Sequence, residues 1–188
     1  MRIRPLDLAL TALLTASIAP AIAATQDVSA TLNIAGVINS DIEDHCVITL
    51  DQSVINLTSS SNNLINQGEN ATSPERLVVT VQSLNENFTQ CDKDIYNGKI
   101  AIKFTGTHDN ADGTAFANTA TGENAAAGVG IGLFNYNNTP IDSREIYKIR
   151  DLSNDSVNYL GLQLVKLTGQ TVKTGAVAGN ITFQIERL

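Results

Sequence analysis

The amino-acid sequence predicts an all-β fold, an antiparallel sandwich of about seven strands with Greek-key connections. Apolar residues mostly alternate with polar ones, as they do in half-buried strands. The apolar runs are short, and clusters of Asn, Gly, Asp, Ser and Thr separate them. The chain has 188 residues, of which 43% are hydrophobic, and this is enough for one domain with a substantial core.

The strands are predicted from these alternating runs, and the polar stretches between them are predicted to be loops. Among these loops are the turn-rich stretches Thr58–Thr72 and His108–Asn124. A short helix or helical turn is expected over Asp142–Arg150, just after Pro140. The predicted strands are Cys46–Leu50, Ser53–Leu57, Leu77–Ser83, Ile100–Thr105, Val129–Tyr136, Tyr159–Leu167 and Thr174–Glu186.

The first residues have the pattern of a secretory signal peptide, residues 1–23. Arg2 and Arg4 precede a mostly apolar run, and small residues follow it, so we expect cleavage after Ala23. The run is too short to span a bilayer. Cleavage leaves 188 − 23 = 165 residues, and the loss of Arg2, Arg4 and Asp7 changes the net charge from −7 to −8. The alternative is an amphipathic N-terminal helix.

Composition argues against several classes of function. A net charge of −7 disfavours a nucleic-acid partner, whose grip depends on cationic side chains. Aromatic residues make up 5% and Trp is absent, which disfavours a base-stacking surface or a sugar platform built on Trp. Two Cys and two His are too few for a structural zinc site unless carboxylates complete it. We therefore expect neither a metal nor a cofactor.

The two cysteines, Cys46 and Cys91, allow a single intramolecular bridge, and export permits it. A closed loop of about 45 residues is worth about 4 kcal/mol in the chain-entropy model. The alternatives are buried free thiols or a redox site. The sequence contains no C-x-x-C motif, and neither Cys lies beside a basic cluster, so a structural bridge is favoured.

The sequence offers no convincing catalytic group. His45 is next to Cys46, but neighbouring residues on a strand point to opposite faces, so a Cys–His pair is not expected. The other histidine is His108. The segment Asp109–Gly113 lacks the 12-residue spacing and closing Glu of a helix–loop–helix calcium site, and a solvated loop is expected there. The chain is predicted not to be an enzyme.

Both ends of the chain behind the signal peptide have a one-sided apolar pattern. An N-terminal strand with an apolar face needs a sheet to pair with, and pairing with its own sheet is the generic expectation. Alternatively, a sandwich that lacks its final strand exposes a groove, which the N-terminal strand of a neighbour could fill. The N-terminal set is Val28, Ala30, Leu32 and Ile34, with Gly36 in phase. The C-terminal set is Gly175, Val177, Gly179, Ile181, Phe183 and Ile185.

In the order and spacing of these features the sequence resembles the chaperone–usher fimbrial subunits of the type 1 pilin kind. A signal peptide precedes an alternating strand that ends in Gly36-Val37-Ile38-Asn39, and Cys46 and Cys91 follow. The glycine-rich strand Gly128–Asn135, followed by Pro140, is similar to a strand and turn of the family. Gly175 is fourteenth from the C-terminus, where the family's terminal motif also has a glycine. The resemblance covers essentially the whole mature chain.

The resemblance implies an incomplete immunoglobulin-like β-sandwich that lacks its last strand. Residues 24–38 would be an N-terminal donor-strand extension and 39–188 the pilin domain. The N-terminal set would be inserted into a neighbour, and the C-terminal set would be bound by both chaperone and donor strand. Cys46 and Cys91 would tie two early strands together. The implied partners are neighbouring subunits, a periplasmic chaperone and an outer-membrane usher, with no nucleic acid and no direct membrane insertion.

The implied function is a structural subunit of a cell-surface fimbrium that supports adhesion. Two departures from the family pattern stand out: Arg187 is next to last, where the family usually has an aromatic residue, and an acidic segment, Asp41–Asp44, lengthens the approach to Cys46. With no room for an additional receptor-binding domain, we expect a subunit that builds or caps the fibre. The rival hypotheses are a self-complete exported sandwich, with residues 25–36 on its own sheet, and a secreted hydrolase.

Overall fold

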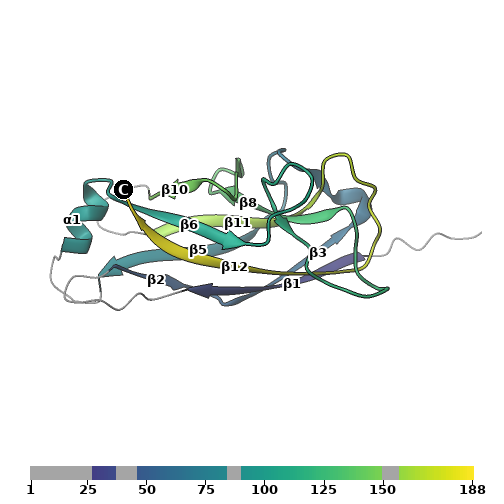
Figure 1. Cartoon of the computed structure of the whole chain (residues 1–188), viewed down its shortest axis with the longest axis horizontal. Helices are drawn as coiled ribbons and strands as arrows, with labels where there is room; N and C mark the ends of the chain where they lie inside the picture. The colour runs from purple at the N-terminus through teal and green to yellow at the C-terminus, as the bar shows by residue number, and fades with distance from the viewer. Residues whose placement is uncertain (1–26, 37–45, 84–89, 150–156) are drawn as a thin grey trace, which may run out of the picture.

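The computed structural model describes residues 27–36, 46–83, 90–149 and 157–188. In this part of the chain the protein is a β-sandwich with one short α-helix and one 3₁₀ turn, Ser61–Asn63. The helix α1, Gln90–Tyr96, lies at one end of the sandwich beside the C-terminus (Figure 1). The strands are β1 (Asp27–Gly36), β2 (Cys46–Leu50), β3 (Val54–Ser60), β4 (Ile65–Asn66), β5 (Glu75–Ser83), β6 (Ile100–Gly106), β7 (Phe116–Ala117), β8 (Val129–Asn135), β9 (Pro140–Ile141), β10 (Ile146–Lys148), β11 (Val157–Lys166) and β12 (Ala176–Arg187).

The strands form two sheets. Sheet A has the order β10-β6-β12-β1-β3, and sheet B has the order β2-β5-β11-β8-β7, with β4 added on β11 and β9 on β8. Strands that follow one another along the chain often lie in different sheets; for example, the chain changes sheet between β5 and β6, between β10 and β11, and between β11 and β12. These crossings are typical of an immunoglobulin-like sandwich. The predicted all-β fold is confirmed.

The core lies between the two sheets, and the period-2 alternation of each strand supplies it. On β12, for example, Val177, Ile181 and Phe183 are almost completely buried, while Asn180 between them is exposed. Sheet B contributes its own row of buried apolar side chains, and the two rows face each other in one cluster. The largest fully buried members of this cluster are Phe116, Phe183, Leu32, Leu77, Ile100, Ile102, Ile131, Leu133, Leu160, Leu162 and Leu164. Phe134 belongs to a second, smaller cluster.

The helix α1 was not predicted, because its apolar content is slight. Cys91, Asp94 and Ile95 are its buried residues, and their spacing places them on one helical face. Seven residues are too short a window for this periodicity to stand out from the surrounding polar sequence. Packing against the sandwich, and the bridge at Cys91, therefore decide the conformation of this segment.

The helix predicted over Asp142–Arg150 is wrong. The Asp142 Oδ1 atom accepts a hydrogen bond from the N–H of Arg144 at 2.9 Å, which makes a local turn instead. After that turn, Ile146–Lys148 pairs as β10 with the free edge of β6. Likewise, the predicted loop Thr58–Thr72 begins within β3, since β3 continues to Ser60 to pair with β1. Pairing with distant strands overrides local preference at both places.

No helix among the described residues is long and apolar enough to cross a membrane. The expected signal peptide, residues 1–23, and the expected acidic segment near Asp41 lie outside the described residues.

Candidate functional site

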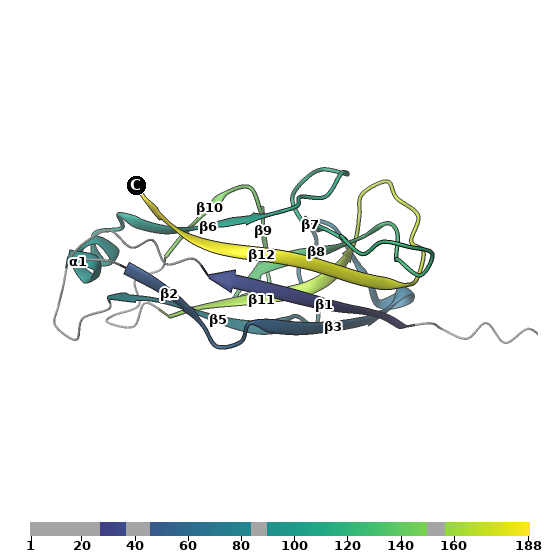
Figure 2. The same cartoon turned by 60° about the horizontal axis from the view of Figure 1, so that its bottom comes forward.

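The main candidate site is a slot in sheet A, which we define as the space between β12 and β3 that β1 fills. Figure 2 shows β1 running between the yellow β12 and the blue β3. β1 pairs with β12 in parallel from Ser29 to Gly36 and with β3 in antiparallel from Asp27 to Asn33. β12 and β3 are joined in the sheet only through β1. Without β1, sheet A would be divided in two, and its core face would be open at the slot.

Leu32 anchors β1 in the slot. Its side chain is fully buried in the main core cluster, while the next residue, Asn33, is exposed. Leu32 is paired with Gly179 on β12 and with Ile55 on β3. The other members of the N-terminal set are at alternate positions of the same strand. In the ladder Ala30 pairs with Val177, Ile34 with Ile181 and Gly36 with Phe183, and Val28 pairs with Ser59 of β3; their side chains lie outside the described residues.

The slot is deep enough for Leu32 because Gly179 has no side chain. A Cβ at Gly179 would lie 2.6 Å from Ile131 Cδ1, which comes from sheet B, and 3.3 Å from Leu32 Cδ1. Real Cβ atoms do not approach a neighbour so closely. Gly175, just before β12, is equally confined, because a Cβ there would meet the carbonyl oxygen of Asn124 and lie 2.7 Å from the Ala126 nitrogen. Both glycines of the C-terminal set therefore have a steric reason to be glycine.

The remaining members of the C-terminal set form the wall of the slot. Val177, Ile181 and Phe183 are buried, and Ile185 is partly buried against the same cluster. The sequence did not single out the opposite wall, Ile55 and Leu57 of β3, which are 2% and 3% exposed. The alternation of apolar and polar residues in Val54–Ser60 indicates that Ile55 and Leu57 face the core. That pattern does not identify which strand β3 pairs with.

The end of the sandwich beside the C-terminus is held by a disulfide between Cys46 and Cys91, whose Cα atoms are 5.2 Å apart. The expectation that it ties two strands together is wrong in one respect: Cys46 begins β2, but Cys91 lies on α1. The bridge therefore fixes the helix to sheet B. It also removes the thiolate that a Cys–His pair would need, and His45 lies outside the described residues.

Arg187 also reaches this helix from the end of β12. Its Nη1 atom donates to Asp94 Oδ2 at 2.6 Å, and the Asp94 side chain is only 8% exposed. The hydrogen bond from Gln90 Nε2, and then the bond from Arg187, hold the pKa of Asp94 below its ordinary value. The residue that departs from the family pattern thus has a local partner, and it links the C-terminal strand to the helix that carries Cys91.

The other candidate groups from the sequence are structural. His108 stacks on Phe116, and its Nδ1 atom is 2.9 Å from Ser143 Oγ. Asp109 organises its own loop by accepting the N–H groups of Ala111, Gly113 and Ala115. Burial raises the pKa of Asp109, but these hydrogen bonds outweigh that effect and hold the pKa below its ordinary value. No cluster of His, Cys, Asp and Glu suited to a metal ion occurs among the described residues.

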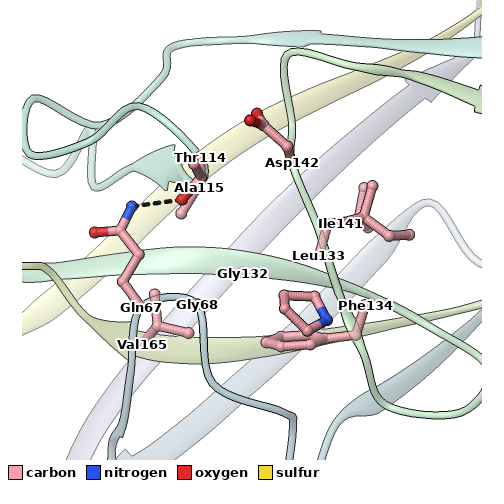
Figure 3. A pocket seen from close by; sticks show the side chains of 11 residues that line it. Gln67, Gly68, Thr114, Ala115, Gly132, Leu133, Phe134, Ile141, Asp142 and Val165 are labelled. Carbon is pink, nitrogen blue, oxygen red and sulfur yellow. Dashed lines mark hydrogen bonds between the residues drawn. The ribbon is translucent and has the colours of Figure 1, made fainter.

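A small pocket of about 230 Å³ lies on the outer face of sheet B, away from the slot. Figure 3 shows Phe134 and Val165 at its base and Gln67, Thr114 and Asp142 around its mouth. The polar groups of the mouth already have partners in the chain. Gln67 donates to Thr114 at 3.0 Å, and Asp142 is paired with Arg144 at 2.6 Å. These bonds leave little at the mouth to orient a ligand.

Several solved structures resemble this one, and two of them are pilus proteins, although no curated protein matches the sequence. The crystal structure of the P pilus rod subunit PapA is 14% identical, with a TM-score of 0.49, and the match covers 81% of this chain and 99% of that chain. The Burkholderia pseudomallei antigen and type I fimbria protein BPSL1626 is 17% identical, with a TM-score of 0.41, and the match covers 85% of this chain and 93% of that one.

The comparison with family models is decisive, because it covers most of the chain. The model described as fimbrial protein matches residues 31–186, which include the end of β1, both cysteines and nearly all of β12. The protein therefore belongs to the fimbrial protein family, whose members are structural subunits of surface fimbriae that assemble with other pilus subunits and are not enzymes.

Proposed function

We propose that this subunit polymerises by donor-strand complementation, with β1 of one subunit entering the slot of the next. One observation carries the proposal: β12 and β3 are joined only through β1. β1 is also the first of the strands that the structure describes. A strand in that position can leave one sandwich and enter another without unfolding the rest of the fold.

The contacts in the slot favour a long-lived joint. Full burial of a side chain such as Leu32 is worth about 1.5–3 kcal/mol. Each backbone hydrogen bond of the ladder adds about 0.5–1.5 kcal/mol net. A strand paired on both sides, with an apolar face in the core, resembles the interior of a fold more than a docking patch. Slow dissociation follows, and a fibre outside the cell needs it.

In its own slot β1 has one neighbour of each direction. It runs parallel to β12 and antiparallel to β3, and Cys46 follows Gly36 by ten residues. This short tether favours the observed direction within one chain. A strand from another molecule has no such tether and can also enter antiparallel to β12 and parallel to β3, which keeps one ladder of each kind.

The same slot would be the binding site for a periplasmic chaperone, which would supply a temporary strand, and an outer-membrane usher would then guide assembly. The subunit would build or cap the fibre, and adhesion would be a property of the assembled organelle. These roles are those of the chaperone–usher fimbrial subunits that the sequence resembles. The buried faces of Ile181 and Phe183 support them, because an empty slot would expose this apolar surface to water.

A second candidate is a self-complete exported sandwich that binds a ligand or a protein as a monomer. The observation that favours it is that β1 lies in the slot of its own chain. The two candidates differ in whether β1 can be exchanged between molecules.

The test uses oxidised protein made without residues 24–38 and a synthetic peptide of that sequence, and it measures thermal unfolding with and without the peptide. Donor-strand complementation predicts a large and nearly irreversible stabilisation by the peptide. A peptide with Leu32→Asp should lose the effect, because it would place a charge in the core. A peptide with Asn33→Asp is the matched control and should keep it, since Asn33 is exposed.

Sizing of the full chain completes the test. Head-to-tail oligomers should form when the concentrated protein is warmed, and they should persist on dilution. A truncated body that is already stable and ignores the peptide would rule out this mechanism and favour the monomeric candidate.

A further inference from the structure

A second hollow on the outer face of sheet B has an arginine in its lining, unlike the pocket of Figure 3. It measures about 380 Å³ and lies between the ends of β5, β8 and β11, where two tyrosines, Tyr136 and Tyr159, are 60% and 42% exposed. Sheet B separates this hollow from the slot, so the two sites are independent. The lining residues are Pro74, Arg76, Asn135, Tyr136, Asn138, Tyr159, Leu160 and Gly161.

Pro74 forms a wall of the hollow and packs closely on Gly161, which has no side chain. Gly161 pairs with Arg76 on β5 and with Phe134 on β8, so it lies on the central one of three strands. A Cβ at Gly161 would lie 2.8 Å from Pro74 Cβ, so any larger residue would displace this wall. The hollow is thus a defined feature of the sheet surface.

Backbone hydrogen bonds hold Asn138 in place at the edge of the hollow. Its N–H donates to the Asn135 carbonyl at 2.9 Å, and its own carbonyl accepts from the Ala71 N–H at 2.9 Å. Its φ of 66° is in the left-handed region, which Asn adopts more readily than most residues. Asn138 is thus held at the lining of the hollow by a fixed turn, and a carboxamide can both donate and accept hydrogen bonds.

Arg76 provides a positive charge that is held in one place. Its guanidinium lies 3.9 Å from the centroid of the Tyr159 ring, a cation–π geometry. Within the described part of the chain, the ion pairs are Arg144–Asp142 and Arg187–Asp94, and neither involves Arg76. In a chain with a net charge of −7, a stacked guanidinium without a carboxylate partner in the described residues is well placed to receive an anion. The planar fork of Arg suits a carboxylate in particular.

We propose that this hollow binds a carboxylate-bearing monosaccharide unit, a sialic acid or a uronic acid. The carboxylate would bind Arg76, hydroxyl groups would bind Asn138, and the apolar face of the sugar ring would lie on Tyr136. The hollow is near the lower end of the size range of ligand sites, which fits one sugar ring better than a peptide segment. Tyrosine here supplies the aromatic surface that a chain without Trp otherwise lacks.

The experiment is a titration of the oxidised, folded protein, followed by the NMR shifts of its backbone amides. The probes are methyl glycosides of N-acetylneuraminic acid and glucuronic acid, with the neutral methyl galactoside for comparison. Saturable shifts are expected at Asn135, Asn138 and Gly161 with the two acidic sugars, and the neutral sugar should bind about tenfold more weakly. High salt should weaken the binding of the acidic sugars and leave the binding of the neutral sugar unchanged.

Variants of Arg76 separate the effect of its positive charge from the effect of the planar shape of its guanidinium. Arg76→Gln should lower the affinity for the acidic sugars about tenfold and leave the weak affinity for the neutral sugar unchanged. The affinity of Arg76→Lys for the acidic sugars should lie between those of the parent and of Arg76→Gln. Lys166→Gln makes the same change in net charge at the far, exposed end of β11 and should have no effect. Thermal unfolding of each variant reports whether its fold is intact.

Three outcomes would overturn the proposal: no saturable shift with an acidic sugar, equal binding of acidic and neutral sugars, or an Arg76→Gln variant that binds as the parent does. If the same amides shift with protein concentration alone, and Arg76→Gln abolishes this, the occupant is a carboxylate of a second copy of the chain. That result would also overturn the sugar site. None of these outcomes depends on whether β1 exchanges between subunits.

Discussion

Gly179 and Leu32 are paired in the parallel ladder of β12 and β1, and the missing side chain of one makes room for the other. Leu32 is fully buried as a result, and Ile131 approaches the same point from the opposite sheet. One residue from each of three strands thus meets in the slot. At this contact, sheet B packs on two neighbouring strands of sheet A, β1 and β12.

The first prediction concerns Gly179→Ala. The added methyl group would lie 2.6 Å from Ile131 Cδ1, so the variant should unfold at a lower urea concentration, with a loss of about 1–3 kcal/mol. Ile131→Val removes that Cδ1 atom, so the double variant should recover part of the loss. If Ile131→Val gives no recovery in the Gly179→Ala background, the crowding at this contact is not the cause.

A second prediction compares two neighbours on β1. Leu32→Ala should lower the free energy of unfolding of the monomer by about 2–5 kcal/mol, because it leaves a cavity in the slot. Asn33→Ala, on the exposed side of the same strand, should change it by about 0.5 kcal/mol or less. Urea unfolding followed by circular dichroism measures both. Equal effects would mean that β1 is not seated in the slot in solution.

The third prediction tests the link between Arg187 and Asp94 through its pH dependence. The pKa of Asp94 is lowered in the folded protein, so its contribution to stability is present above the unfolded pKa of about 3.9 and is lost as the pH falls through the folded pKa. Arg187→Met should therefore lower the melting temperature at neutral pH, and the two proteins should converge in acid. Glu186→Gln is the control for a neighbouring charge. A difference in melting temperature between the parent and Arg187→Met that persists unchanged at low pH would contradict a stabilising ion pair between Arg187 and Asp94.

The fourth prediction concerns the disulfide. Replacing both Cys46 and Cys91 by Ala should destabilise the fold by about 4 kcal/mol through the closed loop of 45 residues. Protection of the backbone amides from hydrogen exchange should fall more at α1 than at the far end of the sandwich. The reason is that the buried Cys91 fixes this helix to sheet B. Hydrogen exchange of the amides in Gln90–Tyr96 would measure the local effect. Protection that survives in the double variant would show that packing alone holds the helix.

The fifth prediction joins β1 to its own sheet. Asn33 and Asn180 are partners in the parallel ladder and both are exposed, so Asn33→Cys with Asn180→Cys can form a bridge within one chain. The bridged protein should remain monomeric under conditions in which the parent polymerises, and mild reduction should restore assembly. Asn33→Cys alone is the control. Polymers formed by the bridged protein would rule out the exchange of β1.

Much of the fold could be predicted from the sequence because alternation is a local signal. The strand Cys46–Leu50 agrees with β2 at both ends, and the predicted Ile100–Thr105 is one residue shorter than β6. A strand with one buried face shows that face in its own residues. The segments where the prediction was wrong, α1 and Asp142–Arg150, are short, and distant contacts decide their conformation.

By itself, the sequence determined which residues are apolar on each terminal strand, that Cys46 and Cys91 could form one bridge, and that Gly175 and Gly179 are in phase with the apolar residues near the C-terminus. Only the tertiary structure decided that β3 is the other wall of the slot and that Ile131 is the reason for Gly179. It also decided that Cys91 lies on a helix and that Arg187 reaches Asp94. The physical reason is that alternation is a local pattern, which indicates only whether a residue faces the core. The residue that it contacts across the sheet is decided by strand pairing, which brings together residues far apart in the chain.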